Sequence, residues 1–286
     1  MGAVARTLRN PWRKPYFLKA FTWVFLAWSL APLVVAALFS FNDGLSRTSW
    51  QGFSWQWYFG LPGESLFQSP ELGRALLQTL RLGFITAAVA VPLGTAFAIG
   101  MDRWRGRSIA GRFVRDSGNG LMVLAFMIPE IVLGISLFFA FAEVLKFIHL
   151  GTAAQAAGLI MMTVPYPAII VRARLLSIDR HHEEMAMDLG ASPTQALRLA
   201  LMPLLYPAIA LSTALVLARA IDDLVVVRYL AASSSSVTLT MKIYGGFRSA
   251  PTPVYNAMAT VMTLMTLSMA WVAYSAFRRL ETARRT

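Results

Sequence analysis

The sequence predicts an all-α, polytopic integral membrane protein with six transmembrane helices. Apolar residues make up 57% of its 286 residues and charged residues only 14%, whereas a soluble domain carries about 45–50% and 25%. Six apolar stretches are each long enough to cross a bilayer, which takes about 20 helical residues. The basic residues fall in short clusters between these stretches, as is typical of membrane proteins.

The six predicted spans are apolar on all sides rather than along one stripe, as expected of helices in lipid. The first follows five basic residues, but its apolar part is longer than the roughly 7–15 residues of a signal-peptide core, so we interpret it as an uncleaved helix. Prolines within the spans are compatible with helices whose freed carbonyls are satisfied by neighbours. We interpret the whole of 1–286 as one transmembrane domain, with spans at 17–41, 75–101, 118–146, 154–174, 206–227 and 254–277.

The distribution of Arg and Lys predicts the orientation. One side of the six spans holds eighteen of these residues and the other side six. Cytoplasmic loops carry the excess of positive charge, so both termini and the loop 175–205 are predicted to be cytoplasmic. The segments 42–74, 147–153 and 228–253 are then extracytoplasmic. The aromatic residues of 42–74 suit a membrane–water interface.

Several function classes are excluded by simple features. The net charge of +12 does not form one stripe, which argues against a nucleic-acid partner. None of the four lysines follows a glycine, so the chain has no phosphate-binding loop for ATP. The run His181 to Glu184 lacks the spacing of a zinc-hydrolase helix, and exposed turn residues account for it better. The sequence shows no converging acid–base or metal residues of an intramembrane enzyme, so we assign no catalytic residue.

The segment 183–203 has the pattern of two short helices joined by a corner. Glu183 and Glu184 stand at the start of the first helix, where acidic residues favour the helix dipole. Gly190 can adopt the left-handed conformation that ends it. Ser192 then caps a second helix, with Pro193 at its first position and Gln195 completing a capping box. We expect Pro203 and Pro207 to close that helix, which leaves a stiff elbow on the cytoplasmic face.

This elbow resembles the EAA loop of binding-protein-dependent ABC importer permeases. That loop reads Glu-Ala-Ala, three residues, Gly, nine residues and Ile-x-Leu-Pro. The matching positions here are Glu184, Ala186, Gly190 and Pro203, and the departures are Met185, Ala200 and Met202. The departures are apolar or small, which leaves the shape of the docking surface open. The resemblance implies a type I importer permease fold in which the coupling residues are Glu184, Ala186, Gly190, Ser192, Pro193 and Pro203.

The resemblance extends over nearly the whole chain. The runs 127–137, 221–226, 238–244 and 256–260 are similar to the second permease subunit of spermidine/putrescine importers, although the serines 233–236 replace a Gly/Pro-containing stretch usual there. It implies a bacterial inner-membrane protein with three kinds of partner besides lipid: a second homologous permease, two cytoplasmic ATPase subunits and an extracytoplasmic solute-binding protein. ATP and Mg²⁺ would bind to the ATPases, and this chain would hold no cofactor. A permease for another small solute, such as an aminophosphonate, an opine or another cation, and a membrane assembly or signalling protein stay open as alternatives.

Acidic residues in the spans are candidates for a solute path, because ionisable groups in the membrane usually face partners or water. The candidates are Asp222, Asp223, Glu130 and Glu143. Carboxylates beside aromatic rings would suit the ammonium groups of a polyamine. Arg219 lies three and four residues before the two aspartates, however, which is the spacing of an ion pair within one helix. The sequence therefore leaves open whether the aspartates guide a solute or only balance Arg219.

Overall fold

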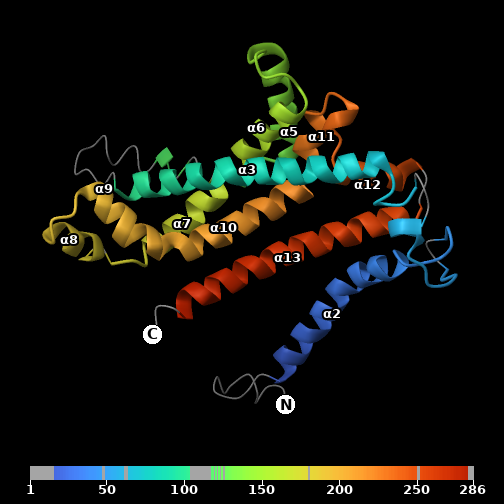
Figure 1. Ribbon diagram of the computed structural model, residues 1–286, viewed down its shortest axis with the longest axis horizontal. Helices are drawn as coiled ribbons and strands as arrows, with labels where there is room; N and C mark the ends of the chain where they lie inside the picture. The colour runs from blue at the N-terminus through green and yellow to red at the C-terminus, as the bar shows by residue number, and fades with distance from the viewer. Residues whose placement is uncertain are drawn as a thin grey trace, which may run out of the picture.

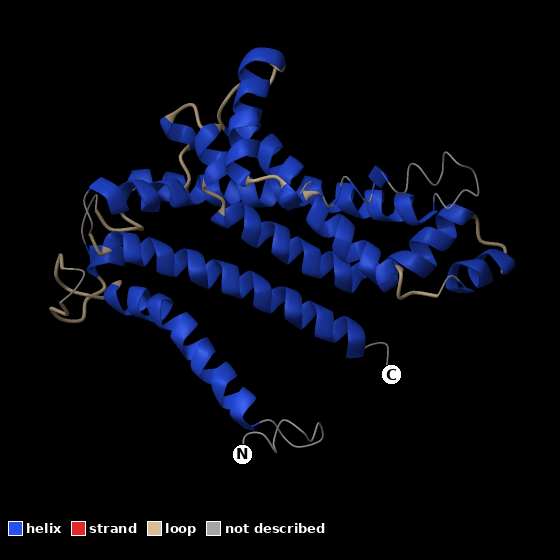
Figure 2. Cartoon of the chain, turned by 180° about the vertical axis from the view of Figure 1, so that it is seen from behind, coloured by secondary structure: helices blue, strands red, loops and turns tan. Residues whose placement is uncertain are grey.

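The computed structural model describes residues 16–46, 49–60, 64–103, 117–118, 120, 122, 124, 126–179, 181–249 and 252–282. This part of the chain is helical apart from turns, loops and an isolated bridge between Asn42 and Phe53 (Figure 2). Five helices in it are long and apolar enough to cross a membrane: Tyr16–Phe39, Pro70–Asp102, Thr152–Leu175, Pro193–Asp222 and Val254–Ser275. The prediction of an all-α membrane protein is confirmed. The sixth span, 118–146, crosses residues outside the described set, so the count of six stays a prediction.

Helices α3, α10 and α13 run roughly along the molecule's longest axis, whereas α2 is inclined to them and diverges from α13 toward the N-terminus (Figure 1). Helix α10 (Met202–Asp222) packs against α3 (Pro70–Arg103), α7 (Pro165–Leu175) and α13 (Val254–Thr282), whereas α2 (Tyr16–Phe39) packs on α13. Helices α8 (His181–Asp188) and α9 (Pro193–Ala196) lie at one end of the molecule, and α12 (Leu239–Ser249) lies at the opposite end (Figure 1). The predicted cytoplasmic elbow and the predicted outer segments thus lie at opposite ends.

Two predicted spans are interrupted, which corrects their expected form. The span 118–146 breaks at Ile128 and Pro129, after which α5 (Glu130–Phe139) begins and passes into a π turn at Ala140–Val144. Proline has no N–H to donate and disfavours a helical residue before it, so the helix restarts after Pro129. The span 206–227 ends at Asp222, because Asp223 is extended, and a short α11 (Val225–Tyr229) follows. The outer segment 228–253 is itself largely helical, with α12 in it.

The expected closing of the second elbow helix at Pro203 was wrong. Helix α9 continues through a π turn at Leu197–Leu201 into α10 without a break. The π turn replaces an i–4 bond with an i–5 bond from Met202 N–H to Leu197 carbonyl, which widens the helix just before the proline. Pro203 lies directly after this turn, at the second residue of α10, so the widened turn accommodates its ring and its missing N–H. The elbow is consequently continuous with a membrane span.

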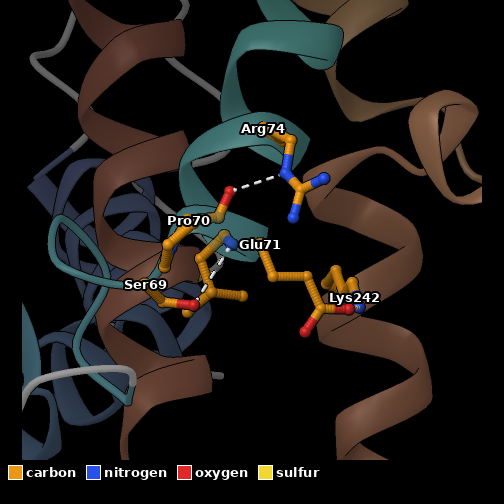
Figure 3. A network of polar contacts seen from close by, with 6 residues as sticks. Ser69, Pro70, Glu71, Arg74 and Lys242 are labelled. Carbon is orange, nitrogen blue, oxygen red and sulfur yellow. Dashed lines mark hydrogen bonds and ion pairs between the residues drawn. The ribbon is translucent and has the colours of Figure 1, made fainter.

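The outer ends of the helices are joined by a buried cluster and by polar contacts. Trp57 and Tyr58 are buried against α13 beside Leu72 and Ile221. The start of α3 is capped by Ser69, whose hydroxyl accepts a hydrogen bond from Leu72 N–H at 3.4 Å (Figure 3). Glu71 of α3 forms an ion pair with Lys242 of α12 (Figure 3). These contacts fix α12 to the long helix α3.

Candidate functional site

The corner of the elbow has the helix end that the sequence predicted. Gly190 has φ +91°, in the left-handed region that glycine tolerates. Ala191 N–H donates to the Ala186 carbonyl at 3.0 Å, and Gly190 N–H donates to the Met187 carbonyl at 2.9 Å. These two bonds form a Schellman motif, which satisfies the last carbonyls of α8. Ala186 therefore contributes its backbone to the corner, in addition to its small side chain.

The second half of the elbow is capped from both directions. Ser192 Oγ accepts a hydrogen bond from Gln195 N–H at 3.4 Å, and Gln195 Oε1 accepts one from Ser192 N–H at 2.8 Å. Pro193 occupies the first turn, as expected. The capping box confirms the predicted local geometry. The Schellman motif at the end of α8 and the capping box at the start of α9 both use hydrogen bonds between residues at most five positions apart. The geometry of the corner is therefore determined by local contacts.

The outer surface of the elbow is exposed, with apolar side chains beside acidic residues and histidines. No residue of α8 is buried, and Met185 and Leu189 are both exposed, Leu189 to 90%. On its inner side the elbow continues into a buried cluster that includes Val171, Leu201 and Leu205. Large apolar side chains such as Leu189 are exposed here beside charged ones, as at the polar rim of many interaction sites. The elbow thus presents one side to the outside and is fixed to α7 and α10 by the other.

Glu184 forms a hydrogen bond with His181 across the first turn of α8. Its Oε2 lies 2.9 Å from His181 Nδ1, and both side chains are exposed. This hydrogen bond, together with the negative charge of Asp179, raises the pKa of His181 above its usual value. Glu184 therefore stands on the exposed face of the elbow with a cation beside it when His181 is protonated.

Arg219 pairs with Glu130, a partner that the sequence analysis did not consider. Its Nη2 forms an ion pair with Glu130 Oε1, and its Nε lies 3.4 Å from the hydroxyl of Tyr166. The described residues give Arg219 no ion pair with Asp222 or Asp223. The spacing of Arg219 from the two aspartates would allow an ion pair within α10. The carboxylate of Glu130, at the start of α5, lies closer to the guanidinium. Glu130 is thereby compensated by Arg219.

The two aspartates have different surroundings. Asp223 is 2% exposed, and its Oδ1 accepts a hydrogen bond from Val227 N–H at 3.1 Å, which caps α11. Its backbone carbonyl accepts a hydrogen bond from Thr240 Oγ1 of α12 at 2.9 Å. Asp222 is exposed and has no hydrogen bond or ion pair with the described residues. Asp223 therefore serves the backbone around the helix break, whereas the side chain of Asp222 is exposed.

Glu143 lies apart from these acids. It belongs to the π turn that ends α5, in the hairpin that projects from the bundle (Figure 1), and its Oε2 lies 4.0 Å from Lys146 Nζ with both side chains 71% exposed. Of the four predicted path residues, the structure brings Asp222 and Asp223 together, places Glu130 on Arg219, and leaves Glu143 at the hairpin.

Sequence reasoning missed a buried glutamine network that holds the helix break in place. Gln155 of α6 (Thr152–Thr163) is fully buried, and its Nε2 donates to the carbonyls of Val227 and Ser236, both at 2.8 Å. Its Oε1 accepts from Gln78 Nε2 of α3 at 3.1 Å. A glutamine within an apolar span is the signal that could have identified it. The network connects α3 and α6 to the segment that follows Asp222.

Two hollows lie on either side of Tyr244. The first, of about 540 Å³, is lined by residues of α2, α10, α12 and α13, among them Asp222, Leu224, Thr240, Tyr244 and Met262. The second, of about 730 Å³, is lined by α5 and α11 with Leu224, Arg228 and Tyr244. Both volumes suit a small organic solute. The hollows share Leu224 and Tyr244, so they meet at the helix break.

The profile of the family described as "Binding-protein-dependent transport system inner membrane component" matches residues 90–286, more than half of the chain. The chain belongs to this family. The permease is 31% identical over 255 residues to the spermidine/putrescine transport system permease protein PotC of Haemophilus influenzae, with 89% of this chain and 94% of PotC covered. It is 29% identical to the putrescine transport system permease protein PotI of Escherichia coli, covering 97% and 94% of the two chains.

Among solved structures, the permease resembles a chain of a bacterial alginate ABC transporter in complex with an alginate pentasaccharide-bound periplasmic protein. The TM-score is 0.68 at 18% identity, with 93% of this chain and 95% of that chain covered. At this identity the likeness shows the fold, which is that of type I ABC importer permeases. The expected family and fold are therefore confirmed.

Proposed function

We propose that this permease is the membrane subunit of an ATP-driven importer of small aliphatic amines, of which the polyamines of the named relatives are the first candidates. The proposal comes from the elbow: a stiff, exposed corner that is continuous with a membrane span, in a chain of this family. A soluble ATPase that pushes on the elbow would move α10 directly, because no flexible linker separates them. ATP and Mg²⁺ would bind to two cytoplasmic ATPase subunits, which makes this chain a non-enzymatic subunit.

The solute class in this proposal is supported by the named relatives and by the exposed carboxylate of Asp222 in the first hollow. The complex would also contain a second homologous permease and an extracytoplasmic solute-binding protein that delivers the solute. The same rocking motion of the spans would open the path alternately to each side. The chain would lie in a bacterial inner membrane with both termini in the cytoplasm.

Topology and coupling can be tested separately. The chain contains no cysteine, so Thr194→Cys in the elbow and Ser235→Cys in the outer tract form a matched pair of exposed reporters. An impermeant thiol reagent added to intact cells should label position 235 and spare position 194. The reverse pattern contradicts the orientation.

For coupling, Glu184→Lys reverses the charge on the exposed face of α8, and Glu183→Lys does so one residue earlier as a control. The purified complex with Glu184→Lys should assemble yet show little solute-stimulated ATP hydrolysis. A chain that never co-purifies with an ATPase is not an importer subunit, and full stimulation of the Glu184→Lys complex would contradict the role of this residue in coupling.

A further inference from the structure

The two hollows at the helix break carry opposite charges. Asp222 lines the first hollow and Arg228 lines the second, while Leu224 and Tyr244 line both. A solute that spans the shared wall would therefore meet a carboxylate at one end and a guanidinium at the other. The remaining lining is mainly apolar, which suits an aliphatic chain between two polar ends.

Arg228, like Arg248 on the same ring, has no acidic partner among the described residues, whereas three other cations have one. Lys242 pairs with Glu71 (Figure 3), Arg219 pairs with Glu130, and Lys146 lies 4.0 Å from Glu143. The guanidinium of Arg228 has no hydrogen bond or ion pair with any described residue. Its guanidinium carbon lies 5.2 Å from the centre of the Tyr244 ring, an arrangement that orients the side chain and leaves its N–H donors unused.

A pure polycation fits this arrangement poorly. A guanidinium that lines the second hollow without an acidic partner repels ammonium groups that enter it. The planar fork of arginine instead matches the oxygens of a carboxylate or a phosphonate, which it can bind through two parallel hydrogen bonds. Asp222, which is exposed and without an ion pair, suits the ammonium group of the same solute.

We infer that the solute carries an anionic group as well as an amine, and that Arg228 on Tyr244 receives the anion while Asp222 receives the ammonium. The chemical class is an ω-amino acid whose anionic end is a carboxylate or a phosphonate. This inference rests on the proposed function as a solute permease. The inference goes beyond the proposed function, because the named relatives point to polyamines, whose ends are both cationic.

The test uses the whole complex in proteoliposomes, with its ATPase and solute-binding protein, and three labelled probes. Putrescine carries two amines, 4-aminobutyrate replaces one with a carboxylate, and 2-aminoethylphosphonate replaces it with a phosphonate. We expect at least one of the two zwitterions to be taken up in preference to putrescine, and the better one identifies the anionic group. Preference for putrescine over both zwitterions overturns the inference and leaves the proposed function intact.

Substitutions assign the effect to Arg228. Arg228→Gln should lower kcat/KM for the preferred zwitterion by roughly ten- to hundredfold, as expected for loss of a charge-assisted contact, while uptake of putrescine stays unchanged or rises. The matched control is Arg248→Gln, because Arg248 also lies over Tyr244, at 5.9 Å, but lines neither hollow. It should change uptake of the zwitterion less than twofold.

Assembly provides the second readout. Arg228→Lys keeps the positive charge but loses the fork, so it should assemble normally and still lower zwitterion uptake. If either Arg228 variant loses the second permease subunit during purification, Arg228 contacts that subunit, and the inference is overturned. If none of the three probes is taken up by an assembled complex that hydrolyses ATP, the solute class is wrong. The proposed function itself fails only if no ATPase is captured.

Discussion

Gln155 gives the sharpest test of how the helix break is held. Replacing it with Leu keeps the volume roughly constant and removes three hydrogen bonds at a side chain with no exposure. The carbonyls of Val227 and Ser236 then lose a donor in a buried, apolar setting. Each unsatisfied buried group costs about 1–3 kcal/mol, whereas hydrogen bonds between membrane helices average about 0.6 kcal/mol. We expect a total loss of about 2–4 kcal/mol.

The comparison with Gln78 sets the scale of this effect. Gln78→Leu removes the bonds to Thr152 Oγ1 at 2.9 Å and to Gln155 Oε1 at 3.1 Å, but leaves both carbonyl contacts of Gln155 in place. It should therefore cost about half as much, roughly 1–2 kcal/mol. Met161→Leu is the control on the same helix, because Met161 is exposed and changes no hydrogen bond.

Thermal unfolding in lipid nanodiscs and hydrogen exchange of the segment 223–240 are the assays. At about 2–4 °C per kcal/mol for a chain of this size, Gln155→Leu should lower Tm by roughly 5–15 °C and accelerate exchange in that segment first. Equal shifts for the Gln155 and Gln78 variants, or unchanged exchange in 223–240, would refute the view that Gln155 fixes the break.

Further predictions concern the elbow and Arg219. Gly190→Val should destabilise the elbow by about 1–2 kcal/mol through backbone conformation alone, since nothing lies within 4 Å of an added Cβ. In the assay of solute-stimulated ATP hydrolysis, Gly190→Asn should lower the stimulation less than Gly190→Val does. NMR titration should place the pKa of His181 above about 6.5, and Glu184→Gln should lower it. Because the folded pKa is raised, this contact stabilises α8 below pH 6.5 and is lost as the pH rises through the folded pKa. Glu130→Gln should lower Tm, and adding Arg219→Gln should recover part of that loss; additive losses contradict the pairing.

The elbow was predictable from sequence because its determinants are local. A glycine with φ +91° and a Ser–Gln capping box act within six residues, so the sequence contains both the signal and the partner. Long spans were predictable for a similar reason, since length and apolar composition decide whether a helix suits a bilayer. The predicted helix end at Pro203 was wrong, because a π turn at Leu197–Leu201 accommodates the proline. No residue pattern in the sequence predicts that turn.

The interior of the candidate site was less predictable, because its partners are distant in sequence. Arg219 pairs with Glu130, 89 positions earlier, rather than with the aspartates on its own helix. Hydropathy cannot show that the fifth span ends at Asp222, since Leu224 to Val227 are as apolar as a span requires. The partners of Gln155 are backbone carbonyls, whose positions depend on the tertiary fold and not on residue type.

The helix interruptions are not scattered through the bundle. Arg219, near the end of α10, contacts Glu130, the first residue of α5, and Tyr166, the second residue of α7. One guanidinium therefore joins the end of α10, the start of α5 and the middle of the span Thr152–Leu175, whereas α3 runs through 34 residues without a break. Broken helices in membranes need polar partners within the protein, because lipid offers none. If the spans rock as rigid bodies, the bending falls at these points, and Arg219 is placed to hold one arrangement of them. An importer that used a different hinge would have no need for a cation at position 219. A leucine would fill the same space without placing a charged group in the membrane.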